Sequence, residues 1–435
     1  VTIRPPQVVP GVAEVEVRAV TAGVRQMRIT PVPLTGPAAK LPPVPDLMSR
    51  SPDDPQFFTG SVWLMACCNW QVRIFVEGGQ GNAEMAVPVS GLATRVLEMD
   101  RTLGGVLLFF LLFLSAGAIG IAGAYAREGR LEPGVDPGAA EIRRGRIATA
   151  ACAVAVAAAV WLGNLWWTSD HTAFQRFIYK PLKMTATYRE GTLHLDLESS
   201  GWLMPLDDLI PDHNHLMHMY MIRLPGMERV WHLHPEMQST GKFTHALPPV
   251  PAGRYQLFAD IIHKRGLPET LVAEIDLPDV AGKPLAGDDS SGAGLADRTT
   301  APLSGGYRMV WERPGQPLRA RRPESFRFRV EDPQGQPARD LEFYMGMQGH
   351  AAFIKTDRTT FSHVHPSGTV SMAALALAEG GSAPADEHAA HRMGGSLPPA
   401  VSFPYALPQP GDYRIVVQIK RAGRVETGIF DARAE

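Results

Sequence analysis

The sequence predicts a mainly β protein with a two-helix transmembrane hairpin, and three observations favour that class. Proline and glycine are frequent, at 38 and 42 of 435 residues, and most apolar patterns are short and alternating. Two long uncharged runs interrupt this pattern, at 103–125 and 147–167. All 14 histidines follow residue 170, many of them in a segment that recurs later in the chain. We therefore expect a small N-terminal β-sandwich, the hairpin, and two tandem immunoglobulin-like β-sandwiches at the C-terminus.

Composition excludes several classes of function. The formal net charge is −2, so the chain has no basic excess that would favour a nucleic-acid partner. The 3 cysteines cannot form a disulfide framework, because Cys67 and Cys68 are adjacent and Cys152 lies in an apolar run. No nucleophile elbow, Walker loop, dinucleotide fingerprint or haem-attachment motif is present. The sequence therefore predicts no catalytic residue.

Residues 1–97 are predicted to form an extracytoplasmic β-sandwich-like domain. Within 61–77, apolar residues at 70, 72, 74 and 76 alternate with Gln71, Arg73, Phe75 and Glu77, which is typical of a strand with at least one buried face. Two glycines at 78–79 indicate a turn, and 85–89 is the expected return strand. The domain contains no histidine, so we expect a structural or interaction role for it.

The two uncharged runs are long enough to cross a hydrocarbon core of about 30 Å as helices. Five arginines lie close to or within the loop at 126–146, at positions 127, 130, 143, 144 and 146. The positive-inside rule places that loop in the cytoplasm and both flanks outside. Small residues at Gly117, Gly120 and Gly123 favour close packing of the two helices. The lipid bilayer is therefore the first predicted partner.

The rest of the chain reads as two related lobes, 170–285 and 300–435, joined by a Gly/Ser/Asp-rich linker at 281–305. HLMHMYMIR matches MQGHAAFIK, and VWHLHP matches FSHVHP. Two further pairs follow in the same order, ALPPVPAGRYQLFADI with ALPQPGDYRIVVQI and ETLVAEIDL with ETGIFDARA. The second copy carries an additional segment after Met372, which includes His388 and His391. This order indicates a duplication.

The matched histidines are candidate metal ligands. Residues i and i+2 of a strand share a face, so His232 and His234 project together, as do His363 and His365. A neighbouring strand would add His218 to the first pair and His350 to the second. The full predicted ligand set is His215, His218, His232, His234 and His263 in the first lobe, and Met347, His350, His363 and His365 in the second.

Imidazole with thioether nearby suits copper, whereas magnesium or calcium would require carboxylates. Zinc is the main rival, because three histidines with an open position also describe a zinc site. Two alternatives stay open for the residues themselves. The methionines at 217, 219 and 221 are either core or soft ligands, and each histidine pair is either a metal site or a hydrogen-bonded strand end with no metal.

Two segments resemble known proteins. NWQVRIFVEG, at 69–78, resembles a strand of the small periplasmic copper-resistance sandwiches of the C type, although the histidine ligands of that family are absent here. HLMHMYMIRLPGMERVWHLHP, with the turns that follow it, resembles duplicated histidine-rich lobes of uncharacterised bacterial membrane-anchored periplasmic proteins. The resemblance implies a bacterial inner membrane location, with both large flanks in the periplasm, and copper binding by association.

Three hypotheses about function follow. The leading one is a membrane-anchored periplasmic protein that binds copper for storage, delivery or resistance. The alternative is a non-catalytic accessory subunit of a respiratory or photosynthetic membrane complex, with the lobes as docking surfaces. A copper-dependent or zinc-dependent enzyme is the third.

Overall fold

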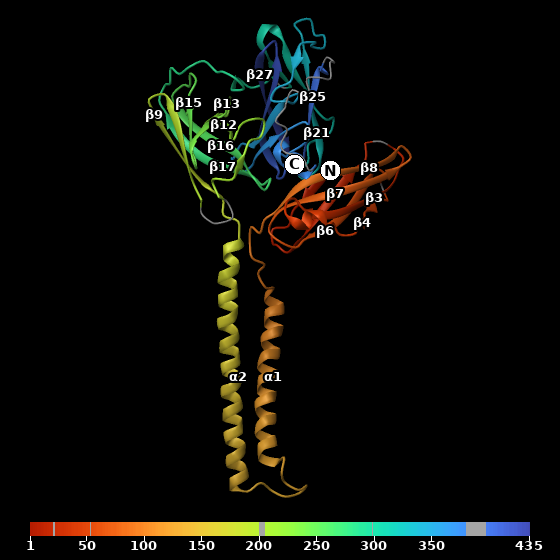
Figure 1. Cartoon of the computed structure of the whole chain (residues 1–435), viewed down its shortest axis with the longest axis vertical. Coiled ribbons are helices and arrows are strands. Elements are labelled where there is room, and N and C mark those ends of the chain that lie inside the picture. The colour runs from red at the N-terminus through yellow and green to blue at the C-terminus, as the bar shows by residue number, and fades with distance from the viewer. Residues whose placement is uncertain (21, 53, 200–204, 298, 380–396) are drawn as a thin grey trace. The chain divides into compact units, whose positions relative to one another are not determined.

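The computed structural model describes residues 1–435 except 21, 53, 200–204, 298 and 380–396. His388 and His391 therefore lie outside the described residues. The chain forms two compact units, one of Val1–Leu92 with Lys180–Glu435 and the other of Ala93–Tyr179. Strands make up most of the first unit and two long helices most of the second (Figure 1). The predicted mainly β chain with two long apolar helices is confirmed.

The N-terminal domain consists of two four-stranded antiparallel sheets, β1-β2-β6-β5 and β4-β3-β7-β8. Its strands are β1 (Thr2–Arg4), β2 (Gly11–Arg18), β3 (Val24–Pro33), β4 (Asp46–Leu47), β5 (Ser49–Arg50), β6 (Phe57–Leu64), β7 (Cys68–Gly78) and β8 (Gly81–Gly91). Alternate residues of β7, such as Val72 and Ile74, join one buried core with Phe58 of β6. The stretch predicted as one strand at 61–77 is thus the end of β6 and most of β7.

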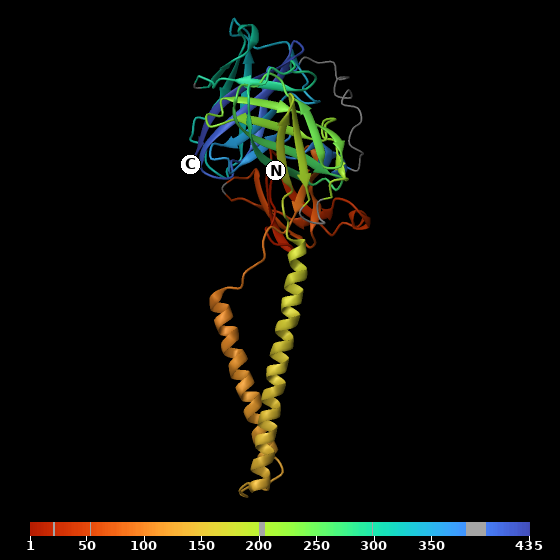
Figure 2. The same ribbon diagram turned by 90° about the vertical axis from the view of Figure 1, so that its left-hand side faces the viewer.

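The second unit is a helical hairpin of α1 (Arg101–Glu128) and α2 (Ala139–Phe174). Both helices are long and apolar enough to cross a membrane. Figure 2 shows them together near their connecting loop and apart at their other ends. Gly123 lies at the close approach, where an added Cβ would be 2.1 Å from Thr149 Oγ1. Gly117 and Gly120 have nothing within 4 Å of such a Cβ, so close packing through them was predicted wrongly.

Each C-terminal lobe contains one four-stranded sheet and one larger sheet. The first lobe has β9 (Lys183–Arg189), β10 (Thr192–Glu198), β11 (Leu209–Ile210), β12 (His218–Arg223), β13 (Arg229–Leu233), β14 (Glu236–Ser239), β15 (Lys242–Ala246), β16 (Gly253–His263), β17 (Pro268–Leu277) and β18 (Ser290–Ala293). The second has β19 (Thr300–Pro302), β20 (Arg308–Glu312), β21 (Glu324–Glu331), β22 (Leu341–Glu342), β23 (His350–Lys355), β24 (Phe361–Val364), α3 (Met372–Ala378), β25 (Ala400–Tyr405), β26 (Gly411–Arg421) and β27 (Arg424–Ala434).

The larger sheets share a strand order. It is β11-β16-β12-β13 in the first lobe, with β17 on β16, and β22-β26-β23-β24 in the second, with β27 on β26. The first sheet continues to β18, which pairs with β13. Part of the stretch predicted as a linker is therefore structured. The residues of β18, Ser290–Ala293, have the polar and glycine-containing composition of a linker, and they form a short strand at the edge of the sheet.

The two larger sheets pack against each other, which sequence did not predict. One buried cluster joins Tyr220, Ile222 and Phe258 of the first lobe to Ile354 and Val416 of the second. Strands β12 and β23 are consequently buried on both faces. Side chains of odd and even positions in β12 thus have different surroundings, because a strand alternates its faces.

This alternation decides between the two readings of the methionines. Met217, Met219 and Met221 are buried and lie on the face of β12 opposite to that of His218 and Tyr220. They fill the core of the first lobe, whereas the even positions face the second lobe. The alternative in which these three methionines are soft ligands is not supported.

Candidate metal centre

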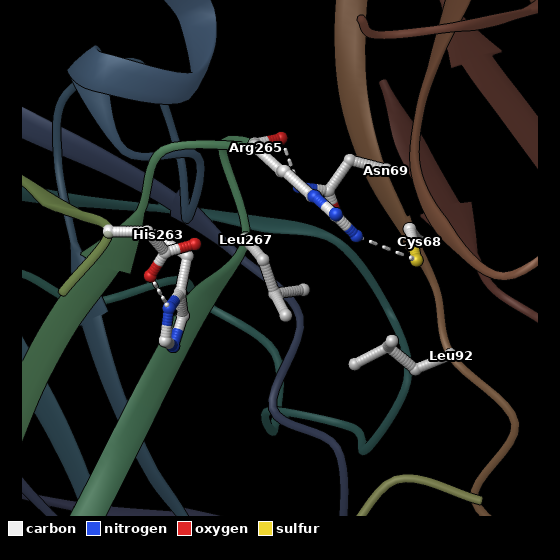
Figure 3. A pocket seen from close by; sticks show the side chains of 7 residues that line it. Cys68, Asn69, Leu92, His263, Arg265 and Leu267 are labelled. Carbon is white, nitrogen blue, oxygen red and sulfur yellow. Dashed lines mark hydrogen bonds and ion pairs between the residues drawn. The ribbon is translucent and has the colours of Figure 1, made fainter. Parts of the chain in front are cut away.

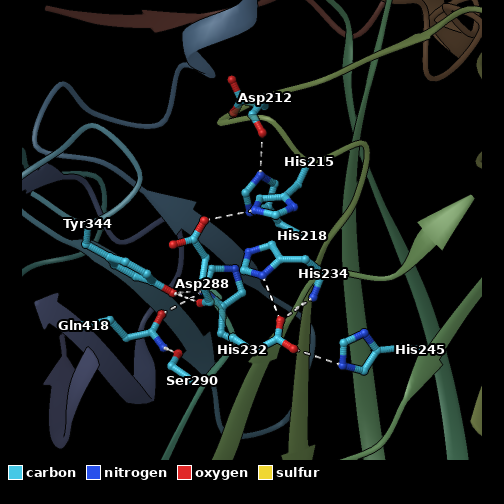
Figure 4. Close-up of polar contacts among 11 residues, drawn as sticks. Asp212, His215, His218, His232, His234, His245, Asp288, Ser290, Tyr344 and Gln418 are labelled. Carbon is cyan, nitrogen blue, oxygen red and sulfur yellow. Dashed lines mark hydrogen bonds and ion pairs between the residues drawn. The ribbon is translucent and has the colours of Figure 1, made fainter. Parts of the chain in front are cut away.

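Eight imidazoles gather where the two larger sheets face each other. Their neighbouring ring centroids are separated by distances from 4.0 Å, between His215 and His234, to 6.4 Å, between His232 and His350. Five come from the first lobe and three from the second: His213, His215, His218, His232, His234, His350, His363 and His365. Figure 4 shows four of the first-lobe rings, those of His215, His218, His232 and His234, with polar partners. The cluster belongs to the interface between the lobes.

The first triad consists of His218, His232 and His234, whose ligand nitrogens all lie within 4.8 Å of one another. Tyr220 pairs with His232 in the antiparallel register of β12 and β13, which places His218 across from His234. His232 and His234 share a face of the sheet. The structure thus brings together the three residues that the strand argument selected in this lobe.

The second triad consists of His213, His350 and His365, again with ligand nitrogens within 4.8 Å of one another. His213 comes from the first lobe, from a tight turn in which Asp212 and His215 exchange backbone hydrogen bonds of 2.9 Å. The sequence prediction omitted this residue and had a second site made from the second lobe alone. The sequence feature that could have indicated His213 is the segment DHNH, which is typical of a turn. In the structure it forms a turn, with φ of 49° at His213 and 67° at Asn214.

Hydrogen bonds to the first triad fix which nitrogen of each ring is available. His218 Nε2 lies 2.9 Å from the Asp212 carbonyl oxygen, His232 Nδ1 lies 3.0 Å from Gln418 Oε1, and His234 Nδ1 lies 3.0 Å from Asp289 Oδ1. Each of these nitrogens must carry the proton, because its partner only accepts. The opposite nitrogens, His218 Nδ1, His232 Nε2 and His234 Nε2, are buried without a hydrogen-bond partner among the described residues. Metal-binding histidines are held by outer partners in this way.

The second triad repeats part of this arrangement. His350 Nε2 lies 3.2 Å from the Tyr344 carbonyl oxygen, which corresponds to the Asp212 carbonyl in the first lobe. His365 Nδ1 lies 3.3 Å from the Val370 carbonyl oxygen, and its Nε2 has no hydrogen-bond partner within the described parts of the chain. His363 stands beside the triad, with its Nε2 3.1 Å from His350 Nδ1.

Five of the imidazoles are neutral at pH 7. Burial, followed by the neighbouring imidazoles, lowers the pKa of His218, His232, His350 and His365 well below the ordinary value. The same causes lower the pKa of His363 to about 3. A neutral imidazole offers the lone pair that a metal requires, so no proton has to leave these rings before binding.

His263 is not brought into the cluster and has another role in the fold. Figure 3 shows His263 bonded through Nδ1 to Asp208 Oδ1, at 2.6 Å. Its Nε2 lies 3.4 Å from Glu269 Oε2. Although burial opposes the change, these carboxylates raise its pKa. The second lobe has Arg421 at the same register position, with Asp340 at 3.1 Å and Glu426 at 3.0 Å. Both positions therefore hold a cation between two carboxylates.

The two remaining predicted ligands lie at matching turns. His215 stacks on His234, and its Nε2 is 3.2 Å from Asp288 Oδ2. Met347 ends the turn that begins at Tyr344, as His215 ends the turn that begins at Asp212. His215 thus flanks the first triad, and a role for Met347 as a ligand stays a prediction.

Replacement of Asp289 tests the outer partners. Although burial opposes it, hydrogen bonds from His234 and His245 hold the pKa of Asp289 well below its usual range, so this carboxylate is ionised. We expect Asp289→Ala to weaken metal binding by the first triad roughly 10- to 100-fold, because the His234 ring loses its acceptor. Competition titration of the full chain measures the change, with exposed Asp276→Ala as the control. Equal affinities for Asp289→Ala and the wild type would show that the outer carboxylate has no part in binding.

Comparison with known proteins identifies one family model, which describes a domain of unknown function (DUF8832) and matches residues 299–435. No curated protein matches the chain. Among solved structures, a tetra-tandem repeat from the extending region of a large adhesion protein aligns at 7% identity over 99% of this chain and 72% of that one, with a TM-score of 0.18. The Escherichia coli adhesin FdeC aligns at 8% identity over 100% and 95%, with a TM-score of 0.16. The BSP domain of a biofilm associated protein aligns at 8% identity over 97% and 63%, with a TM-score of 0.17. Likenesses this low do not bear on function.

Proposed function

We propose that this chain is a membrane-anchored copper-binding protein that acts in copper storage, delivery or resistance. One observation carries the proposal. Three buried imidazoles of the first triad each donate a ring proton to an outer acceptor and leave the opposite nitrogen without a partner among the described residues. Their ligand nitrogens lie within 4.8 Å of one another. Without a bound cation, these buried nitrogen acceptors have no partner, and an unsatisfied buried acceptor costs free energy. A cation bound by all three nitrogens would remove that cost.

The donor set favours copper or zinc over hard cations. Both triads consist of imidazole alone, whereas calcium and magnesium prefer oxygen ligands. Copper is the cation we propose, since it binds nitrogen sites more tightly than the other first-row divalent ions do. Zinc binding in its place is an outcome that the titration below distinguishes.

Membrane anchoring rests on the helical hairpin. Its two helices have 28 and 36 residues and are apolar along most of their length. Arginines gather at their connected ends. Arg127 lies in the last turn of α1 and Arg130 just after it, and three more lie at the start of α2, at positions 143, 144 and 146. By the positive-inside rule, the proposed orientation has the connecting loop in the cytoplasm and the sandwiches, which we regard as immunoglobulin-like, in the periplasm of a bacterium.

Metal analysis of the full chain in detergent tests the proposal. We expect two equivalents of copper, one for each triad, in protein purified without chelators and titrated with Cu(I), Cu(II) and Zn(II). The double variant His232→Ala, His234→Ala should lose one equivalent. The control His194→Ala, on β10 in the other sheet of the first lobe, should retain both. Absence of bound metal in the wild type, or equal binding by the double variant, would overturn the proposal, and a preference for zinc would overturn its choice of metal.

A further inference from the structure

The ligand nitrogens of both triads are enclosed, so a cation needs a route to them. His232 and His350 are 0% exposed, and His218 and His365 are 3% exposed. One cavity of about 190 Å³ reaches the cluster from the side of β16 and β17. Its lining includes His218 of the first triad, His365 of the second, and His363 beside them. A single cavity therefore touches both triads.

The chemistry of this cavity suits a cation. Two carboxylates line it, those of Asp212 and Asp260, and neither lysine nor arginine is among its described lining residues. Two buried imidazole nitrogens in its wall, His218 Nδ1 and His365 Nε2, have no hydrogen-bond partner in the described parts of the chain. Pro268 and Thr270 lie on the exposed rim. The cavity thus runs from an exposed rim to the side chains of His218 and His365, one residue of each triad.

Asp260 and Gln418 hold equivalent positions in the two lobes, and only Asp260 lines the cavity. Asp260 occupies the register position across from His218, and Gln418 occupies the same position across from His350. The Gln418 amide is buried and bonded to His232 and Ser290. The Asp260 carboxylate instead borders the cavity, with its side chain 20% exposed and Oδ2 3.5 Å from His363 Nδ1.

Among the described residues, no lysine or arginine forms an ion pair with the Asp260 carboxylate. Its hydrogen bond within the described residues comes from the Thr270 hydroxyl, at 2.5 Å. A carboxylate in such a place gains from a cation that arrives in the cavity, because opposite charges attract strongly where water is excluded.

We propose that this cavity is the uptake site for the metal cation, with the Asp260 carboxylate and the His363 imidazole as its first ligands. The inference rests on the proposed function and names the route to the same centre. From His363 the cation passes to the second triad through His350, whose Nδ1 lies 3.1 Å from His363 Nε2. His218 offers the corresponding step to the first triad. The transfer exchanges ligands and requires no change in oxidation state.

Rates of metal transfer test the route. Wild-type chain and Asp260→Asn are mixed in detergent with Cu(I) held by a soluble chelator, and uptake and release are followed by the absorbance of the chelator complex. A charged cleft raises on-rates by about 10- to 1,000-fold, so we expect uptake by Asp260→Asn to be at least about tenfold slower. The number of bound ions and the final affinity should stay within about threefold of the wild type, since Asp260 belongs to neither triad.

A second variant narrows the rim without changing charge. Thr270→Trp should slow uptake and release together, whereas Asp276→Asn, an exposed carboxylate on the same strand β17, should change neither. Unchanged rates in both Asp260→Asn and Thr270→Trp, with full stoichiometry, would overturn the uptake site and leave the proposed function intact. Loss of a bound ion in Asp260→Asn would also overturn it, because Asp260 would then be a resident ligand. Absence of copper from the wild type would instead remove the proposed function itself.

Discussion

Acidification from pH 7 to pH 5 should lower the free energy of unfolding of the metal-free protein by on the order of 5 kcal/mol. Five imidazoles cause most of this loss, because burial depresses their pKa in the folded state: His218, His232, His350, His363 and His365. The unfolded chain takes up protons on these rings below its pKa of about 6.5, whereas the folded chain does not. Stability is therefore lost as the pH falls from about 6.5.

The size of the effect follows from proton linkage. Each ring contributes up to about 1.4 kcal/mol per pH unit below 6.5, so five rings reach an upper limit of about 10 kcal/mol at pH 5. Asp260 acts in the opposite direction. Its pKa is raised to about 7 in the folded state, so it stabilises the fold as the pH falls through that value. This offsets the loss by roughly 2 kcal/mol.

Urea unfolding of the chelator-treated chain at a series of pH values measures the change. The variant His363→Gln removes one titrating ring, so its stability should fall less steeply with pH, by up to about 1.4 kcal/mol per unit. His194→Gln, on β10 outside the cluster, should retain the wild-type slope. A stability that stays level between pH 7 and pH 5 would show that the buried rings accept protons without unfolding, against the depressed pKa values.

Substitution of Gly292 should separate the two metal sites. This glycine lies in β18, and an added Cβ would be 2.5 Å from Thr427 Cγ2 and 2.7 Å from Thr427 Cβ on β27 of the other lobe. No real Cβ sits at such distances, so Gly292→Val forces the lobes apart at this point. Overpacking of this kind costs about 1–3 kcal/mol. The first triad lies within one lobe, whereas the second takes His213 from one lobe and His350 and His365 from the other.

We therefore expect Gly292→Val to bind one equivalent of copper in place of two, at the first triad, with an affinity that falls to the extent that His232 loses its hydrogen bond to Gln418 of the second lobe. Metal content and competition titration of the full chain measure both quantities. Ser291→Val is the matched control, since Ser291 is the adjacent, exposed residue of the same strand. Retention of both ions would show that the second triad tolerates displacement of the lobes, and circular dichroism establishes that the variant is folded.

Sequence predicted the parts of this fold that depend on one segment at a time. Alternation at Val72 and Ile74 predicts a half-buried strand, and the uncharged runs predict long helices. Each pattern depends on residues of one segment alone. The first triad followed for the same reason. His218, His232 and His234 lie on two neighbouring strands, and period-2 geometry fixes which side chains share a face.

What sequence did not predict depends on contacts that a residue makes with other segments of the chain. The inclusion of His213 in the second triad requires knowing that its turn meets β23, and nothing in DHNH specifies a partner. His263 was chosen because it ends a strand, although the carboxylates that bind it lie 55 and 6 residues away. Asp289 was not predicted as an outer partner, because the stretch around it has the composition of a linker. In each case, the local sequence around the residue does not indicate which contact it makes in the fold.

The outer partners of the two HxHP segments are exchanged between the lobes. His232 of the first lobe is bonded to Gln418 of the second, and His363 of the second contacts Asp260 of the first. Gln418 and Asp260 hold equivalent places in their own sheets. Such reciprocity is the rule of an isologous interface, in which residue i contacts j and j contacts i. The two lobes thus exchange these contacts as two copies of one subunit would, and the pair of Gln418 and Asp260 is one place where the copies differ.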